Sequence, residues 1–385
     1  MSVTPYSVLM GILCSDVFIV ILYILRKKKI LARYDGIFII LALYTLTFLR
    51  LFIPVEFDFV KIIRAPAVLN PVQRTLQRPI LMEGWTILTL LYAIWIIIAI
   101  FLIIRHLSLY FRVTGMLLGM PDARDARYSA YLEKINNRYG KQVKVNFRVS
   151  DITGVPMGFG IRKFVILLPN QEYSDDQLYY ILLHECNHFY NHDILVKLLT
   201  KLFCCLFWWN PVAYLLSVEL ENTLEIKCDL TSTALLSKKE KIGYLETILE
   251  CLKKTIADSK KLFRCSTALF HADRMDLLPE RMTAITKRNT RKSCIFKLTL
   301  LVFVFALIYL SSYALVFQPY IPLSGQLRKN MDIVSPEHDA YITVDEYGNH
   351  FLILNGTDIK VNISKDDAEL YLSNGIAKEK GGMDQ

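Results

Sequence analysis

Residues 174–188 of the 385-residue chain read SDDQLYYILLHECNH. Ser174, followed by two aspartates and by a glutamine three residues on, is typical of a capping box and predicts that a helix begins here. His184 and His188 are four residues apart, so they lie on one face of that helix, where two imidazoles can bind one Zn²⁺. Glu185 lies beside the metal in such an arrangement and can act as a general base. The stretch therefore predicts a helix that carries most of a catalytic zinc site.

A catalytic zinc site of this kind needs a third protein ligand. The metzincin pattern requires a histidine at position 194, and Ile194 excludes that class. His192 lies near the helix end, where a cation is favourable, and we interpret it as a C-terminal helix residue rather than a ligand. Glu225 and Asp229 lie four residues apart in a stretch predicted to be helical from about 212 to 236. Glu225 can complete a His₂Glu site, and Asp229 can hydrogen-bond the distal nitrogen of a ligand.

Simpler interpretations of both motifs stay open. The His-Glu-x-x-His pattern is short, and an ordinary amphipathic helix with hydrogen-bonded histidines would also contain it. The acidic face that carries Glu225 is also consistent with a solvated helix surface. Glu219 and Glu221 are nearby competitors for the role of third ligand. We retain His184, His188 and Glu225 as the predicted ligands.

Apolar residues make up 53% of the chain, and the mean hydropathy is +0.33. Both values argue against a free cytosolic enzyme and against disorder. The apolar excess is concentrated in segments long enough to cross a membrane as a helix, which takes about 20 residues. Four such spans are predicted, at about 6–25, 36–53, 85–104 and 295–317.

The 45 Lys and Arg residues and the 36 Asp and Glu residues are unevenly distributed along the chain. Basic residues are in excess over 26–35 and over 105–294, whereas the tail 318–385 is acidic. Because Lys and Arg favour the cytoplasmic side, the block 105–294 is predicted in the cytoplasm, and the amino terminus, the loop 54–84 and the tail are predicted outside. The basic residues of the block are spread without a binding motif, so direct nucleic-acid binding is not expected. The chain is thus predicted to be a multi-pass cell-membrane protein.

Residues 198–218 form a further apolar stretch, which we do not interpret as a fifth span. A single crossing here would place the two histidines and Glu225 on opposite sides of the bilayer. Lys201 and the pair Asn210-Pro211 also disfavour a continuous spanning helix. We predict a broken helical hairpin that lies against the membrane, with the metal site close to the inner leaflet.

The remaining patterns predict an α+β domain in the cytoplasmic block and a small β-rich tail. In the block we expect a helix over 126–140 and strands over 143–149 and 158–169. In the tail we expect strands over 341–345, 350–354 and 359–364 and a helix over 366–372. The 8 cysteines include none in the tail, which excludes a disulfide framework there.

Several features together resemble the BlaR/MecR-type antirepressor family of integral-membrane zinc metallopeptidases. They are His184-Glu-Cys-Asn-His188, the turn Trp209-Asn-Pro211, the pair Glu225-x-x-Cys-Asp229 and the strand that ends at Pro169. The resemblance covers about residues 1–317, including the order of three spans, zinc domain and fourth span. It implies a cytoplasmic gluzincin-like α+β domain. It also implies that the strand ending at Pro169 pairs with an extended substrate backbone.

The resemblance further implies roles for individual residues. His184, His188 and Glu225 would bind zinc, Glu185 would activate water, and Asp229 would orient a ligand. Members of the family relay an outside signal into cleavage of themselves and, directly or indirectly, of a DNA-binding repressor. The implied partners are therefore a protein substrate, such as a cytoplasmic DNA-binding repressor, and the lipid bilayer of a bacterial cell. Whether the chain forms a homodimer is left open.

The tail departs from the best-known members of that family, which carry a penicillin-binding sensor domain outside. The tail 318–385 is too short for such a domain and contains no Ser-x-x-Lys, so sensing of beta-lactams by acylation is not expected. The polar stretch 253–264 is the predicted self-cleavage segment, with a charged linker as its simpler interpretation.

Two other functions remain as alternatives. A housekeeping membrane protease of the Ste24/HtpX type also joins His-Glu-x-x-His to a downstream glutamate, but the aromatic-Asn-Pro turn and the Cys-Asp pair argue against it. A non-catalytic zinc-binding membrane receptor or scaffold would use the metal structurally. A structural site has no use for a general base, so Glu185 argues against this second alternative.

Overall fold

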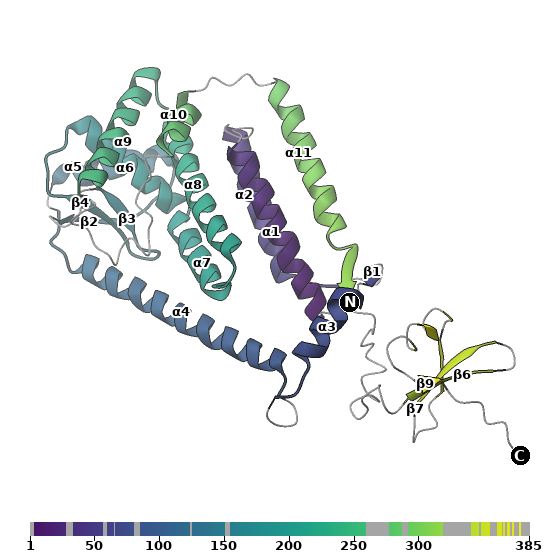
Figure 1. Ribbon diagram of the computed structural model, residues 1–385. Helices are drawn as coiled ribbons and strands as arrows, with labels where there is room; N and C mark the ends of the chain where they lie inside the picture. The colour runs from purple at the N-terminus through teal and green to yellow at the C-terminus, as the bar shows by residue number, and fades with distance from the viewer. Residues whose placement is uncertain are drawn as a thin grey trace, which may run out of the picture. The chain divides into compact units, whose positions relative to one another are not determined.

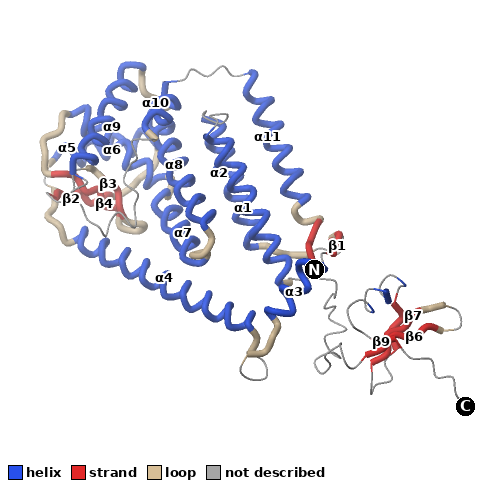
Figure 2. The backbone as a smooth tube through the Cα atoms, viewed as in Figure 1, coloured by secondary structure: helices blue, strands red, loops and turns tan. Residues whose placement is uncertain are grey.

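The computed structural model is mostly helical, with small sheets, and divides into two units, Met1–Pro319 and Tyr320–Gln385 (Figures 1 and 2). In the first unit the structure describes residues 4–27, 34–56, 60–64, 66–80, 85–123, 125–150, 155–258, 277–286 and 292–318. In the second unit it describes residues 340–345, 348–354, 360–363, 365, 368–369, 372 and 377–378.

Each predicted membrane span corresponds to an apolar helix of the first unit. These helices are α1 (Pro5–Lys27), α2 (Tyr34–Phe52), α4 (Ile87–Leu118) and α11 (Lys292–Ser311). Within the described ranges, α1 and α4 are long and apolar enough to cross a membrane, whereas the apolar parts of α2 and α11 are shorter. Only 6% of the most apolar window of α4 is buried, against 33% for α1. Most side chains of that window in α4 therefore face away from the protein, as contact with lipid requires.

The segment between α2 and α4 is joined to the end of α11. It contains β1 (Lys61–Arg64) and α3 (Pro66–Leu76). β1 pairs in parallel with β5 (Leu315–Gln318), which follows α11 closely in the chain. The fourth span was predicted to end at residue 317, but α11 ends at Ser311 and residues 315–317 are part of this strand. Main-chain hydrogen bonds thus connect the predicted loop 54–84 to the end of the last apolar helix.

A small sheet follows α5 (Ala126–Tyr139), the helix predicted over 126–140. Its strands are β2 (Val145–Ser150), β3 (Met157–Phe159) and β4 (Phe164–Pro169), in the order β2-β4-β3. β2 runs parallel to β4, and β3 runs antiparallel to it.

The single strand predicted over 158–169 is wrong, because the chain reverses within it. Gly160 has φ of +95°, and a Cβ at this position would lie 2.1 Å from the carbonyl oxygen of Lys163. Only glycine fits so tight a turn, and it divides the apolar run into β3 and β4.

The sheet order also corrects the strand that the resemblance assigns to substrate pairing. β4, which ends at Pro169, is the central strand, and its residues pair with β2 on one side and with β3 on the other. β2 and β3 are the two edge strands, and β3 is the one that contacts α6, the helix of the predicted zinc motif. An extended peptide adds to a free edge, so β3 rather than β4 is the strand placed to pair with one.

Five helices complete the first unit around this sheet. They are α6 (Asp175–Tyr190), α7 (Asp193–Leu206), α8 (Pro211–Thr233), α9 (Lys238–Asp258) and α10 (Leu278–Thr286). The predicted capping box at Ser174 is present, with reciprocal hydrogen bonds to Gln177. The interruption predicted at Asn210-Pro211 is present too: Asn210 caps α8 by accepting the N–H of Val212, and Pro211 is its first residue.

Two apolar clusters hold these helices. One surrounds α6 and includes the fully buried Leu182, Leu183 and Ile166. The other joins α7 and α8 to α1, α2 and α11, and in it the ring of Phe18 of α1 lies 5.1 Å from that of Phe305 of α11, tilted by 45°. Because α8 packs on the apolar helices and also faces α6, it connects the two parts of the unit.

The second unit contains a four-stranded sheet over its described residues. Its strands are β6 (Ala340–Val344), β7 (His350–Leu354), β8 (Lys360–Ile363) and β9 (Ala377–Lys378), in the order β8-β7-β6-β9. The three antiparallel strands match those predicted, and β9, parallel to β6, was not predicted. The helix predicted over 366–372 lies largely outside the described residues.

Candidate metal centre

The two motif histidines present their outer ring nitrogens to one point. Nε2 of His184 lies 3.3 Å from Nε2 of His188, both on α6. Glu225, from α8, completes the group: Oε2 lies 3.4 Å from Nε2 of His184, and Oε1 lies 3.5 Å from Nε2 of His188. The structure thus brings Glu225 to the two histidines, although it follows His188 by 37 residues in the sequence.

These spacings fit a single zinc ion. Tetrahedral zinc with bonds of about 2.0–2.1 Å to nitrogen and oxygen keeps its ligand atoms about 3.3–3.4 Å apart. The separation of 3.3 Å between the two Nε2 atoms lies at that edge length, and each Nε2 lies 3.4 or 3.5 Å from a different oxygen of the Glu225 carboxylate. Three protein ligands also leave a fourth position for water or substrate, which is the pattern of catalytic sites.

The inner ring nitrogens of both histidines are held by other side chains. Nδ1 of His188 lies 3.0 Å from Oδ2 of Asp193, whose other oxygen accepts a hydrogen bond from Lys227 at 2.7 Å. Nδ1 of His184 lies 2.8 Å from the hydroxyl of Tyr244. With Nδ1 protonated and bonded, each ring presents the lone pair of Nε2 to the metal position.

Asp229 contacts His184 mainly through Tyr244. The Tyr244 hydroxyl donates to Oδ1 of Asp229 at 2.8 Å, whereas the same oxygen lies 3.4 Å from Nδ1 of His184. Arg281 grips the carboxylate from the other side, with Nε 2.6 Å from Oδ2 and Nη2 2.8 Å from Oδ1. Burial alone would raise the pKa of Asp229, but the guanidinium of Arg281 outweighs it and holds that pKa at about 2. Asp229 therefore stays ionised and fixes Tyr244.

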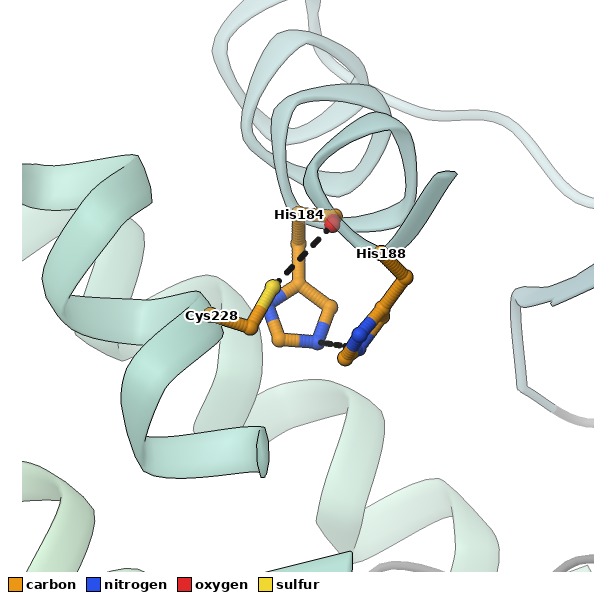
Figure 3. A group of neighbouring side chains, drawn as sticks. All are labelled: His184, His188 and Cys228. Atoms are coloured by element: carbon orange, nitrogen blue, oxygen red, sulfur yellow. Dashed lines mark hydrogen bonds between the residues drawn. The ribbon is translucent and has the colours of Figure 1, made fainter. Parts of the chain in front are cut away.

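Cys228 lies next to the histidines and is a competing donor (Figure 3). Its Sγ lies 3.3 Å from the carbonyl oxygen of His184 and 3.5 Å from Nδ1 of the same residue. His184, His188 and Cys228 are close enough together to hold a metal ion. The sulfur, however, faces the nitrogen that Tyr244 occupies, whereas Glu225 faces Nε2 of both rings. Cys228 and Glu225 therefore approach the His184 ring at different nitrogens.

Lys197 of α7 holds Glu225 in place. Its Nζ lies 2.8 Å from Oε1 of Glu225. Burial raises the pKa of Glu225, but Lys197 and His188 outweigh it, and the pKa lies well below the usual range. The competitors named from the sequence are engaged elsewhere: Glu221 pairs with Lys201, and Glu219 pairs with an arginine of α1.

Glu185 lies against the edge strand of the sheet. Its Oε2 accepts a hydrogen bond from the N–H of Gly158 at 2.6 Å, and burial raises its pKa. A Cβ at Gly158 would lie 2.7 Å from that oxygen and 3.0 Å from the ring of Phe189, so a side chain here would displace the Glu185 carboxylate. Glu185 and His184 line one pocket, which α9 and Val155 also border. A carboxylate with a raised pKa beside two histidines in a pocket has the properties of a general base.

Several residues of this centre were not found from the sequence, among them Asp193, Lys197, Lys227, Tyr244 and Arg281. Asp193 follows His188 by five residues and belongs to no motif named above. An aspartate just after the zinc helix is, however, a pattern that can indicate a hydrogen-bond partner for the ligand histidine. Tyr244 and Arg281 come from α9 and α10, and no spacing links them to the histidines. His192, interpreted as a non-ligand, is exposed and precedes α7 with φ of +55°.

Two histidines from one helix, a carboxylate from a second helix and a further carboxylate beside His184 are the residue types found in metallohydrolase centres. The sequence model of the family described as BlaR1 peptidase M56 matches residues 17–285, and the chain belongs to that metallopeptidase family. The matched region includes every residue of the centre described above.

Curated relatives of known name match parts of the chain. The methicillin resistance mecR1 protein of Staphylococcus aureus is 34% identical over 116 residues, which are 29% of this chain and 20% of that protein. The regulatory protein BlaR1 of S. aureus is 24% identical over 288 residues, 72% of this chain and 46% of the relative. BlaR1 of Bacillus licheniformis is 33% identical over 109 residues, 28% of this chain and 18% of that protein. The chain thus spans less than half the length of these relatives.

Proposed function

We propose that the chain is a membrane-embedded zinc endopeptidase that cleaves peptide bonds at the cytoplasmic side of the membrane. His184, His188 and Glu225 hold the zinc ion, and Glu185 is the general base. The observation that carries this proposal is the convergence of both Nε2 atoms and the Glu225 carboxylate at the spacing of one tetrahedral metal. Membership of the M56 peptidase family supports it.

The residues of the centre divide the work of peptide hydrolysis. A bound zinc ion would supply Lewis acidity, which lowers the pKa of water so that, once deprotonated, it can attack an amide near neutral pH. Glu185 takes a proton from the attacking water and returns it to the leaving amine, and its raised pKa suits both transfers. Tyr244 and Asp193 keep the two imidazoles in the orientation that serves the metal. The edge of β3 beside Glu185 aligns an extended substrate backbone.

We further propose that α1, α2, α4 and α11 are four membrane spans. The amino terminus, the loop 54–84 and the tail 318–385 are then extracytoplasmic, and the block 105–294 is cytoplasmic. The outward-facing apolar side chains of α4 and the distribution of Lys and Arg support this arrangement. The hairpin of α7 and α8 then enters the membrane from its inner side, because Asn210 at its turn bonds to Asp16 near the middle of α1. The exposed Leu199, Trp209 and Tyr214 of the hairpin favour this position.

The names of the relatives support a regulatory role. One is a methicillin resistance protein and another a regulatory protein, so we propose that hydrolysis by this chain is signal-dependent. Its substrate is then a protein, such as a cytoplasmic DNA-binding repressor, and the chain also cleaves itself. The predicted self-cleavage segment 253–264 begins in the last turns of α9, and residues 259–264 lie outside the described part of the chain.

The test compares the purified wild-type chain with Glu185→Gln. We expect about one zinc ion per chain in both proteins, because Glu185 is not a ligand, and hydrolysis of an unfolded protein substrate by the wild type alone. New amino termini found by mass spectrometry in wild-type membranes, and not in Glu185→Gln membranes, would locate self-cleavage. A Glu185→Gln protein that still hydrolyses its substrate would contradict the proposal.

A further inference from the structure

Helix α10 makes polar contacts in two directions through two adjacent residues. Glu280 accepts a hydrogen bond from Nη1 of Arg26, on α1, at 2.7 Å. Arg281 donates hydrogen bonds to Asp229, on α8, from Nε at 2.6 Å and from Nη2 at 2.8 Å. Successive residues of an α-helix point about 100° apart, so α10 can contact an apolar helix and the metal-site helix at the same time.

The buried side chain of Arg26 forms ion pairs with residues of two other helices. It lies in the last turn of α1 with 3% of its surface exposed. Its guanidinium bonds to Glu219 of α8 through Nε and, at 2.9 Å, through Nη2, and to Glu280 of α10 through Nη1. The planar guanidinium fixes the direction of each donor, and a buried charge that loses a partner is strongly unfavourable. These contacts therefore join α1, α8 and α10 at one place.

Apolar packing places α10 against the same elements. Leu278 and Ile285 belong to the cluster around α6, whereas Ala284 packs with Ile226 of α8 and Ile37 of α2. Figure 1 shows α10 beside α8, with which it makes most of its helix contacts. The position of α10 thus depends both on the peptidase core and on the apolar helices.

Arg281 connects α10 to the metal centre. Asp229, which it holds, accepts a hydrogen bond from the hydroxyl of Tyr244, and that hydroxyl lies 2.8 Å from Nδ1 of His184. Nη2 of Arg281 also lies 4.0 Å from Oε2 of Glu225. The orientation of one histidine and the placement of the third ligand therefore both depend on where α10 holds Arg281.

We propose that Arg26 is a positioning residue of the metal site and acts through Glu280 and α10 on Arg281 and Asp229. This inference rests on the proposed zinc site and extends it to regulation. A displacement of α1 relative to α8 moves α10, and this changes the grip on Asp229 and with it the affinity and geometry of the site. The first apolar helix is thereby a regulatory input to hydrolysis.

Glu280→Gln tests this route most cleanly. It removes the carboxylate that joins α10 to Arg26 and leaves the pair of Arg26 and Glu219 in place. The full-length wild type and the variant would be compared by zinc affinity, through competition with a chelator, and by the visible spectrum of the cobalt(II)-substituted protein, which reports ligand geometry. We expect about 3- to 10-fold weaker zinc binding, below the 10- to 100-fold loss typical of a group bonded directly to a ligand, and an altered cobalt spectrum.

Arg50→Gln is the matched control. Arg50 of α2 is also a buried arginine, with 2% of its surface exposed. Unlike Arg26, it donates its hydrogen bonds to the hydroxyl and the carbonyl oxygen of Ser312 and not to carboxylates. Its loss should leave zinc affinity and the cobalt spectrum at the wild-type values. Arg26→Gln should reproduce the effect of Glu280→Gln, and Arg26→Lys should lie closer to the wild type because it keeps the charge.

The outcomes separate this inference from the proposed function. A folded Glu280→Gln protein with wild-type zinc affinity and an unchanged cobalt spectrum overturns the inference alone, as does an equal change in Arg50→Gln. A wild-type chain that binds neither zinc nor cobalt overturns both. If Arg26→Gln does not fold, the comparison of Glu280→Gln with Arg50→Gln still decides.

Discussion

Helix α8 is buried along most of its length, but its two halves pack on different parts of the protein. The first half, together with Leu224 just past its middle, packs Ala213, Leu216 and Leu220 against α1, α2 and α11. The same half also carries Glu219 and Glu221, which pair with Arg26 and Lys201. The second half carries four polar residues that each form a hydrogen bond or an ion pair. These residues are Glu225, Lys227, Asp229 and Ser232. Apolar contacts are non-directional, whereas hydrogen bonds need defined distances and angles. We therefore expect the first half to determine stability and the second half to determine the metal site.

Removal of the third ligand should have the largest effect. Glu225→Ala takes one of three donors from the metal, and we expect zinc affinity to fall by more than the roughly 10- to 100-fold that follows loss of a group bonded to a ligand. Zinc content after dialysis and zinc affinity measure this. Glu221→Ala is the control, because Glu221 also pairs with a lysine of α7, one turn earlier on the same helix. Equal zinc loss in both variants would contradict the assignment of Glu225.

A cavity in the first half of α8 should lower stability without changing the metal site. Leu216 is 1% exposed, and Leu216→Ala is expected to cost about 2–5 kcal/mol of unfolding free energy. Thermal unfolding in detergent, followed by circular dichroism, measures the loss. Zinc affinity of the folded variant should equal that of the wild type. A variant of normal stability that binds zinc weakly would contradict the division of α8 into two halves.

Loss of the charge at Asp229 should weaken zinc binding and leave the helix in place. Asp229→Asn keeps the shape of the side chain but breaks the paired contact with Arg281. We expect zinc affinity to fall about 10- to 100-fold, or about 1.4–2.7 kcal/mol. Chelator competition measures this. Asp193→Asn, at the other histidine, should have an effect of the same size. If Asp229→Asn bound zinc with wild-type affinity, Tyr244 would hold His184 without the Asp229 carboxylate.

The smallest effect is expected at the start of α8. Asn210→Ala removes the cap of the helix and the amide that donates to both oxygens of Asp16 at 2.9 and 3.1 Å. Loss of a cap costs about 1 kcal/mol, so the thermal midpoint should fall by a few degrees. Asn210→Ser, which can still cap, serves as the control for the helix end. Zinc affinity should not change in either variant, and a large decrease would contradict the separation of the two halves.

The sequence contains the local features of the site but not the contacts between distant segments. The capping box at Ser174, the spacing of His184 and His188, and the break at Asn210 depend on neighbouring residues, and all are present in the structure. Tyr244 and Arg281 reach the centre from separate helices, and one sequence holds no signal for such contacts.

The errors in the fold have physical causes too. The apolar run 158–169 has the composition of one strand, and only the close approach at Gly160 divides it into two. The third span was predicted to end at residue 104, whereas α4 continues to Leu118. Arg105 and His106 end an apolar segment but do not end a helix, because both residue types are compatible with helical backbone. Hydropathy therefore bounds the predicted span and not the helix.

The central claim is that zinc is held by two imidazoles and the Glu225 carboxylate, with Cys228 outside the coordination sphere. X-ray absorption at the zinc edge tests it most directly, because zinc–sulfur bonds of about 2.3 Å are distinct from zinc–nitrogen and zinc–oxygen bonds of about 2.0–2.2 Å. The wild-type chain should show only nitrogen and oxygen neighbours, with the outer-shell scattering of two imidazoles. Cys228→Ser should give the same spectrum. A sulfur neighbour at about 2.3 Å that disappears in Cys228→Ser would contradict the assignment of Glu225 as the third ligand.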